Sequence, residues 1–123
     1  MGSQAEVLVV DDDLQVLKLF SKILTRGGYS VRTENSGVRA IEALDDGRPV
    51  DLMVLDLSMP ERDGFDILRV LHTERPGLRV LVTSGCMGGV LLKASKFLGA
   101  TAILNKTDAP TMLLSTVNRL LQR

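Results

Sequence analysis

The chain has 123 residues, 15 Lys and Arg against 15 Asp and Glu, and 45% apolar residues, but only three Phe, one Tyr and no Trp. This length predicts a single domain with an aliphatic core, and the neutral balance argues against binding to nucleic acid or an anionic membrane through bulk charge. With one cysteine, Cys86, no internal disulfide can form, and the sequence contains no run of about 18 apolar residues and no signal-like N-terminus. We therefore expect a cytoplasmic protein without a membrane span.

Short apolar runs alternate with helical patterns along the chain. The first, third and fourth runs are almost continuously apolar, which is typical of parallel strands covered on both faces. The five predicted strands are 6–10, 29–34, 50–56, 78–83 and 101–105.

A helical pattern follows each predicted strand. The expected apolar faces are Val16, Leu19, Phe20 and Ile23, ending at Gly27-Gly28; Val38, Ile41 and Leu44, capped by Ser36 and ending near Gly47; Phe65, Leu68 and Leu71, closed by residues 75–77; Val90, Leu91, Ala94 and Leu98; and, after Asp108, Leu113, Val117, Leu120 and Leu121. Strict alternation of this kind predicts an α/β fold with a doubly wound parallel sheet in three layers.

Polar residues stand where the predicted strands end. Asp11 and Asp12 follow the first strand, Asp56 ends the third, Thr83 ends the fourth and Lys106 follows the fifth. Ligands of such sheets bind outside the carboxyl ends of the strands. If the first and third strands are neighbours, the three carboxylates share one cleft and require cations, for which Mg²⁺ and Lys106 are suited.

With its charge neutralised, this cleft could accept a phosphoryl group. Asp56 is the best candidate for the nucleophile because it ends the most buried strand, and the Thr83 hydroxyl could donate a hydrogen bond to a phosphoryl oxygen.

Four segments in this order, VLVVDDD, DLMVLDLSMPERDGFDIL, VLVTSG and ILNK, resemble the receiver domain of bacterial response regulators, the CheY-like family of two-component systems. The resemblance covers about residues 5–122 and implies a flavodoxin-like sheet in the order 2-1-3-4-5. Residues 1–4 are expected to be a remnant of cloning or a disordered N-terminus.

The resemblance also implies roles for individual residues. Asp56 would accept a phosphoryl group from a histidine kinase or phosphotransfer protein. Asp11, Asp12, Asp56 and the backbone carbonyl of Ser58 would bind Mg²⁺, while Thr83 and Lys106 would contact the phosphoryl group. Asp13 is left without a site role and is expected to cap the first helix.

The output partner would contact the predicted helix at about 89–98, the strand at 101–105 and the helix after Asp108, a surface that could also form a homodimer. No direct nucleic-acid or membrane contact is expected of the domain, and it is not expected to be an enzyme beyond assisting its own phosphorylation and dephosphorylation. It would stand alone or belong to a longer regulator.

Two positions depart from the family pattern. Thr107 stands where proline usually follows the lysine, and a cis bond before a residue other than proline costs about 2.5–4 kcal/mol, so we expect a trans bond and a shifted loop that could aim Lys106 differently. Ile103 replaces the usual aromatic residue, which leaves its coupling to Thr83 in doubt; movement of the glycine-rich loop 84–89 could carry more of the change.

Three alternatives remain at this point. A pseudo-receiver would keep the fold as a protein-interaction module independent of phosphorylation. A Mg²⁺-dependent aspartyl phosphatase would need a second carboxylate two residues after the nucleophile, where this sequence has Ser58. A nucleotide-binding domain would need a glycine-rich loop after the first strand, and this sequence has none there.

His72 is expected to be a surface residue, because the histidine that donates the phosphoryl group belongs to the kinase.

Overall fold

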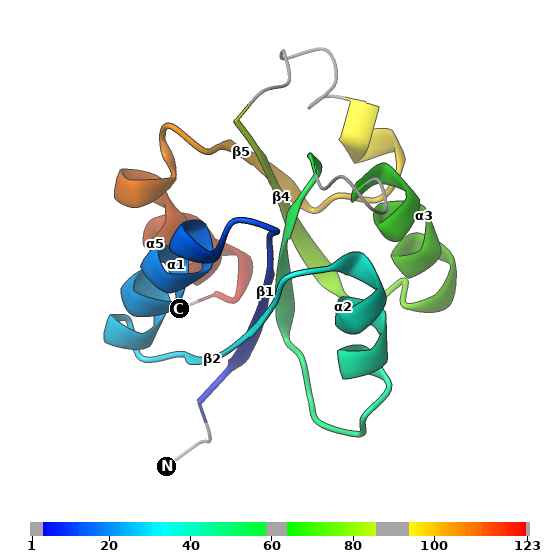
Figure 1. Ribbon diagram of the computed structural model, residues 1–123, viewed down its shortest axis with the longest axis horizontal. Helices are drawn as coiled ribbons and strands as arrows, with labels where there is room; N and C mark the ends of the chain where they lie inside the picture. Colours follow the sequence, from blue (N-terminus) through cyan, green and yellow to red (C-terminus); the bar gives the residue numbers. More distant parts are fainter. Residues whose placement is uncertain (1–3, 59–63, 86–93, 123) are drawn as a thin grey trace.

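The structure, a computed structural model, describes residues 4–58, 64–85 and 94–122 and contains a parallel sheet between two layers of helices (Figure 1). The strands lie in the order β2-β1-β3-β4-β5, so the predicted fold class is confirmed. The elements are β1 Glu6–Val10, α1 Leu14–Arg26, β2 Ser30–Glu34, α2 Gly37–Leu44, β3 Leu52–Asp56, α3 Gly64–Glu74, β4 Arg79–Ser84, β5 Ala102–Asn105 and α5 Ala109–Leu120. Residues 94–97 are also helical, and the rest of the predicted fourth helix, with Val90 and Leu91, lies outside the described residues.

The central strands are apolar because both of their faces are covered. All five residues of β3 are buried, and so are four of the five residues of β1. Helices α1 and α5 cover one face of the sheet, and α2 and α3 cover the other (Figure 1). Phe20, Tyr29 and Leu113 belong to the first core, and Met53, Ile67 and Leu68 belong to the second.

The two predicted helix caps are confirmed. The Asp13 carboxylate accepts a hydrogen bond of 2.9 Å from Gln15 N–H at the start of α1, and the Ser36 hydroxyl accepts one of 3.2 Å from Arg39 N–H at the start of α2. Each satisfies a backbone donor that has no partner within its helix. Gly28 adopts a φ of 96°, which a residue with a side chain rarely takes, so α1 ends at the predicted glycine pair.

Two of the predicted helix faces were partly wrong. In α1 the fully buried side chains are Leu17, Phe20 and Leu24, while Leu19 is exposed. In α2 the buried stripe contains Ala40 and Ala43, while Val38 is exposed. In both helices the predicted apolar stripe was displaced from the stripe that packs against the sheet.

Among the described residues, no helix is both long enough and apolar enough to cross a membrane.

Candidate functional site

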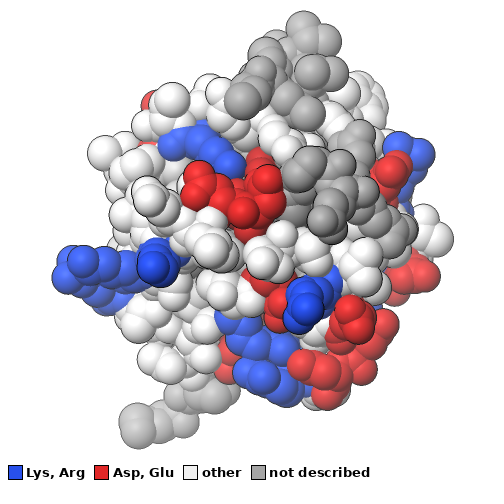
Figure 2. Space-filling view, in the orientation of Figure 1, with Lys and Arg blue, Asp and Glu red and all other residues white. Residues whose placement is uncertain are grey.

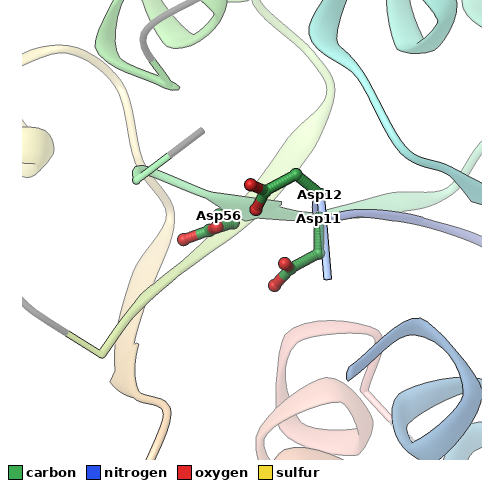
Figure 3. A group of neighbouring side chains, drawn as sticks. All are labelled: Asp11, Asp12 and Asp56. Carbon is green, nitrogen blue, oxygen red and sulfur yellow. The ribbon is translucent and has the colours of Figure 1, made fainter. Parts of the chain in front are cut away.

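Three carboxylates converge at the carboxyl end of the sheet. Asp11 and Asp12 directly follow β1, and Asp56 is the last residue of β3, the strand that pairs with β1. One oxygen from each of the three side chains lies within 4.8 Å of the others. Figure 3 shows the three carboxyl groups arranged around a common space beyond the strand ends.

The three acids differ in their exposure to solvent. Asp11 and Asp56 are each 1% exposed, whereas Asp12 is exposed. At separations below 5 Å and an effective dielectric constant near 20, each pair of ionised carboxylates repels by roughly 3–4 kcal/mol. The cluster therefore requires positive charge.

Lys106 supplies one fixed positive charge. Its Nζ lies 2.7 Å from Asp11 Oδ2 and 3.3 Å from Asp56 Oδ2, so one ammonium group bridges the acids that end two neighbouring strands. Asp11 Oδ2 is buried, and among the described residues its negative charge is balanced by this ion pair with Lys106.

The peptide bond between Lys106 and Thr107 is trans, as expected. The Asn105 side-chain carbonyl accepts hydrogen bonds of 3.0 Å from both the backbone N–H and the hydroxyl of Thr107. These bonds hold the turn in the place where the family pattern has proline. Lys106 is still aimed at the carboxylates.

Burial and charge shift two pKa values in this cluster. Burial raises the pKa of the Asp11 carboxyl, as does the nearby Asp56 charge, and these effects outweigh the hydrogen bonds from Lys106 and Asp13 that lower it. For Lys106, burial acts to lower the pKa, but the hydrogen bond to Asp11 and the charges of both acids raise it above its ordinary value. The ammonium form of the lysine is thus stabilised beside acids that are short of positive charge.

Backbone donors orient the two buried carboxylates. Asp13 N–H donates to Asp11 Oδ1 at 2.9 Å, and Ser58 N–H donates to Asp56 Oδ1 at 3.0 Å. The Asp13 carboxylate caps α1 as predicted, and the backbone N–H of the same residue, for which nothing was predicted, holds Asp11.

Thr83 lies beside Asp56, since the two residues are paired in register between β3 and β4. Its Oγ1 is buried and has no hydrogen-bond partner in the described part of the chain. A buried hydroxyl in this condition costs free energy unless a ligand satisfies it, which makes Thr83 a candidate donor to a bound group.

Sequence reasoning missed one contact at this site. The hydroxyl oxygens of Ser58 and Ser84 lie 3.1 Å apart and connect the segment after Asp56 with the end of β4. The position of Ser84 directly after Thr83 at a strand end was the available signal, but nothing in the sequence indicated that Ser58 would reach it.

The donor set fits a hard divalent cation. Mg²⁺ prefers carboxylate oxygens and water, and the cluster offers one oxygen from each of three carboxylates with an exposed side at Asp12. All six residues predicted for the site lie at this end of the sheet: Asp11, Asp12, Asp56, Ser58, Thr83 and Lys106. His72 is on the surface, as predicted. Cys86 and most of loop 84–89 lie outside the described residues.

The fold and the acidic cluster define a class of signalling domain, and comparison with known proteins agrees. The sequence profile of the response regulator receiver domain matches residues 7–118. The chain belongs to this family, the receiver domains of two-component systems.

Among curated proteins, the chain is similar to the response regulator MprA of Mycobacterium leprae, with 36% identity over 95% of this chain and 51% of that protein. MprA of Mycobacterium avium is 35% identical over the same shares of the two chains. The chain thus spans about half the length of the curated relatives it matches.

Solved structures show the same fold. A CheY-like receiver domain protein of Methanospirillum hungatei superposes with a TM-score of 0.88 at 27% identity, covering 98% of this chain and 95% of that one. The chemotaxis response regulator CheY4 of Vibrio cholerae gives 0.86 at 28%, covering 95% and 98%. The receiver domain of DrrB, described as activated by BeF3, gives 0.84 at 28%, covering 98% and 99%.

Proposed function

We propose that residues 5–122 form a phosphoacceptor receiver domain, which takes a phosphoryl group on Asp56 from a histidine kinase or a phosphotransfer protein. One observation supports this most strongly: a buried carboxylate at the end of the central strand lies within 4.8 Å of two further acids and 3.3 Å from a lysine ammonium. An arrangement that places unbalanced negative charge around one nucleophile is costly unless the site serves a ligand.

In the proposed step, a carboxylate oxygen of Asp56 attacks the phosphorus atom of a phosphohistidine. A new P–O bond forms as the P–N bond breaks, and the imidazole nitrogen leaves with the electron pair. The product on this chain is an acyl phosphate. Because Ser58 N–H holds Asp56 Oδ1, the other oxygen, Oδ2, is the natural nucleophile.

The remaining side chains contribute charge and hydrogen bonds. Lys106, already 3.3 Å from Asp56 Oδ2, would contact a phosphoryl oxygen, and Thr83 would donate its unsatisfied hydroxyl to another. Mg²⁺ bound by Asp11, Asp12, Asp56 and the Ser58 carbonyl would supply the further positive charge that offsets the phosphoryl oxygens.

The proposed output is a change of surface. Phosphorylation would add nearly two negative charges next to Thr83, which lies in β4, and next to Lys106, which lies between β5 and α5. The surface proposed to change is that of the predicted fourth helix, β5 and α5. That surface would contact an output protein or domain, or a second copy of the chain. The domain would act in the cytoplasm without itself binding nucleic acid or membrane, and it would catalyse nothing beyond its own phosphorylation and dephosphorylation.

Incubation with acetyl phosphate and Mg²⁺, followed by intact mass spectrometry, tests the proposal. We expect one added phosphoryl group, no adduct on Asp56→Asn, and no adduct when Mg²⁺ is chelated. Asp45→Asn, at an exposed acid outside the cluster, is the matched control and should be phosphorylated like the wild type. Absence of an adduct together with absence of Mg²⁺ binding would instead support the interaction module.

A further inference from the structure

Strand β2 is an open edge of the sheet. It pairs with β1 on one side only and ends the strand order. Ser30 N–H donates to Ala5 O at 3.0 Å, and Glu34 O accepts from Asp11 N–H at 3.2 Å, so the main-chain groups of alternate residues 30, 32 and 34 face β1. By the alternation of a strand, the N–H and C=O groups of Val31 and Thr33 face outward, where another strand could pair.

An open cavity lies along α1 and reaches this edge at Thr33. It has a volume of about 650 Å³, and its other lining residues all belong to α1, among them the apolar Leu14 and Leu17. Three basic side chains at helical spacing, Lys18, Lys22 and Arg26, also line it, and no acidic residue does. In Figure 2, basic side chains project from the α1 side of the molecule.

A second cavity follows the same edge on the side of α2. It has a volume of about 290 Å³, and Arg32 and Glu34 of β2 line it together with Arg39, Glu42 and Arg48. Thr33 thus lines the cavity on the α1 side and its neighbour Arg32 the cavity on the α2 side, while Glu34, near the end of the strand, borders cavities on both sides. In Figure 1, β2 lies between these two helices.

We propose that the β2 edge binds an extended, acidic segment of a partner protein as a sixth strand. An added strand would pair with the outward groups of Val31 and Thr33 and would send its own side chains alternately into the two cavities, which is how sheet edges obtain both affinity and sequence preference. The side chains on the α1 side would be acidic, to pair with Lys18, Lys22 and Arg26, because the surplus of basic charge lies on that side.

The charge of the residues that line the cavities along β2 indicates that the partner segment is acidic. The cavities along β2, including one of about 430 Å³ that continues the α1 cavity toward Arg39, are lined by six basic and three acidic side chains, whereas the whole chain has equal numbers. One of these basic residues, Arg32, is already paired with Asp46 at 2.8 Å. The surplus lies on α1. A second copy of the chain fits poorly, because antiparallel pairing of two β2 strands would set two basic α1 surfaces side by side.

The proposal is tested by selecting peptides from a random linear library on the wild-type chain, with counter-selection on Thr33→Pro. Proline at this position removes an outward N–H and no bond to β1, and an edge strand tolerates it there. Thr33→Val is the matched control, because it retains the N–H and the extended shape. We expect the selected peptides to carry Asp or Glu at alternate positions, on the side of the added strand that faces α1.

For such a peptide, fluorescence polarisation should show at least tenfold weaker binding to Thr33→Pro and unchanged binding to Thr33→Val. Lys18→Gln with Lys22→Gln should weaken binding several-fold at low salt, while Lys96→Gln should not. In the wild type, hydrogen exchange of Thr33 N–H should slow when the peptide binds, a result that does not depend on how the proline variant folds.

Any of three results with peptides would overturn the proposal, and so would one result with the free chain. They are peptides that bind both position-33 variants equally, shifts in NMR spectra confined to α1 with no protection of Thr33, and failure of the selection to give any peptide that discriminates against Thr33→Pro. Dimerisation of the free chain that Thr33→Pro abolishes would identify a second copy as the occupant and would also contradict it.

Discussion

The two ends of the sheet use the same residue types in different ways. At the carboxyl end, the buried Asp11 and Asp56 share one lysine, and Asp12 adds a third carboxylate to the cluster. Away from this end, where α2 and α3 finish, each arginine has its own acid: Arg32 pairs with Asp46 and Arg75 with Asp45. In each pair one acid balances one arginine, and the carboxylate is open to solvent, so the pairs need no ligand. The difference teaches that a local surplus of buried charge, and not the presence of ion pairs, marks the functional end.

The largest effect on stability should come from removing the lysine. Lys106→Met leaves Asp11 and Asp56 without their fixed cation, so we expect the metal-free chain to lose about 2–3 kcal/mol in its free energy of unfolding, somewhat less than for a fully buried pair. Urea unfolding in the presence of a chelator measures this loss. Lys96→Met, at an exposed lysine, should change stability by less than about 0.5 kcal/mol.

Mg²⁺ gives a second readout on the same variant. Because Lys106 and a divalent cation compete for the same carboxylates, Lys106→Met should bind Mg²⁺ more tightly than the wild type does. Weaker binding would show that the lysine helps to build the metal site and does not compete with it.

Asp11→Asn should stabilise the metal-free chain by about 1–2 kcal/mol at neutral pH, because it removes a buried charge from a site that is short of cations. The pKa of Asp11 is raised in the folded state, so its ionisation lowers stability as pH rises from the ordinary value of 3.8 through the folded value. The advantage of Asp11→Asn should therefore be small below pH 3.8 and grow to its full size as pH rises. Denaturation at a series of pH values measures it, and a constant difference between the two proteins would contradict the assigned pKa shift.

Two threonines provide a smaller and more specific comparison. The Thr83 hydroxyl is buried without a partner, whereas Thr101 Oγ1 accepts a hydrogen bond of 2.9 Å from Val80 N–H. Thr101→Ala should cost about 1 kcal/mol, while Thr83→Ala should be neutral or slightly stabilising. Thermal unfolding checks both, and the phosphorylation rate should fall only for Thr83→Ala. The idea that the Thr83 hydroxyl is reserved for a ligand fails if that variant unfolds readily and accepts phosphoryl at the normal rate.

The smallest effect should come from the balanced pairs. Asp45→Asn removes the partner of Arg75 on an exposed surface, and such pairs contribute about 0.5 kcal/mol or less. Chemical denaturation of this variant beside Asp11→Asn compares one substitution in two environments. A loss at Asp45 as large as the change at Asp11 would erase the contrast between the two ends.

Much of the fold follows from the sequence because buried parallel strands have continuous apolar runs. That pattern predicts the positions of the strands, and the common direction of parallel strands predicts that Asp11 and Asp56 converge. The caps at Asp13 and Ser36 follow from the preference of Asp and Ser for the start of a helix. Leu19 and Val38 were wrongly assigned to the buried faces of their helices. The spacing of apolar residues in a helix fits two adjacent faces, and packing against the sheet decides which of them is buried. The contact between Ser58 and Ser84 and the aim of Lys106 depend on loop geometry that no periodic pattern encodes.

The proposed chemistry rests on Asp56 as the residue that carries the phosphoryl group. The most direct measurement is to phosphorylate the chain with acetyl phosphate and Mg²⁺, reduce the acyl phosphate with borohydride, and locate the resulting homoserine by peptide mass spectrometry. We predict homoserine at position 56 and at no other aspartate. Homoserine at Asp11 or Asp12 with Asp56 intact, or none at all under conditions in which Mg²⁺ is bound, would contradict the assignment.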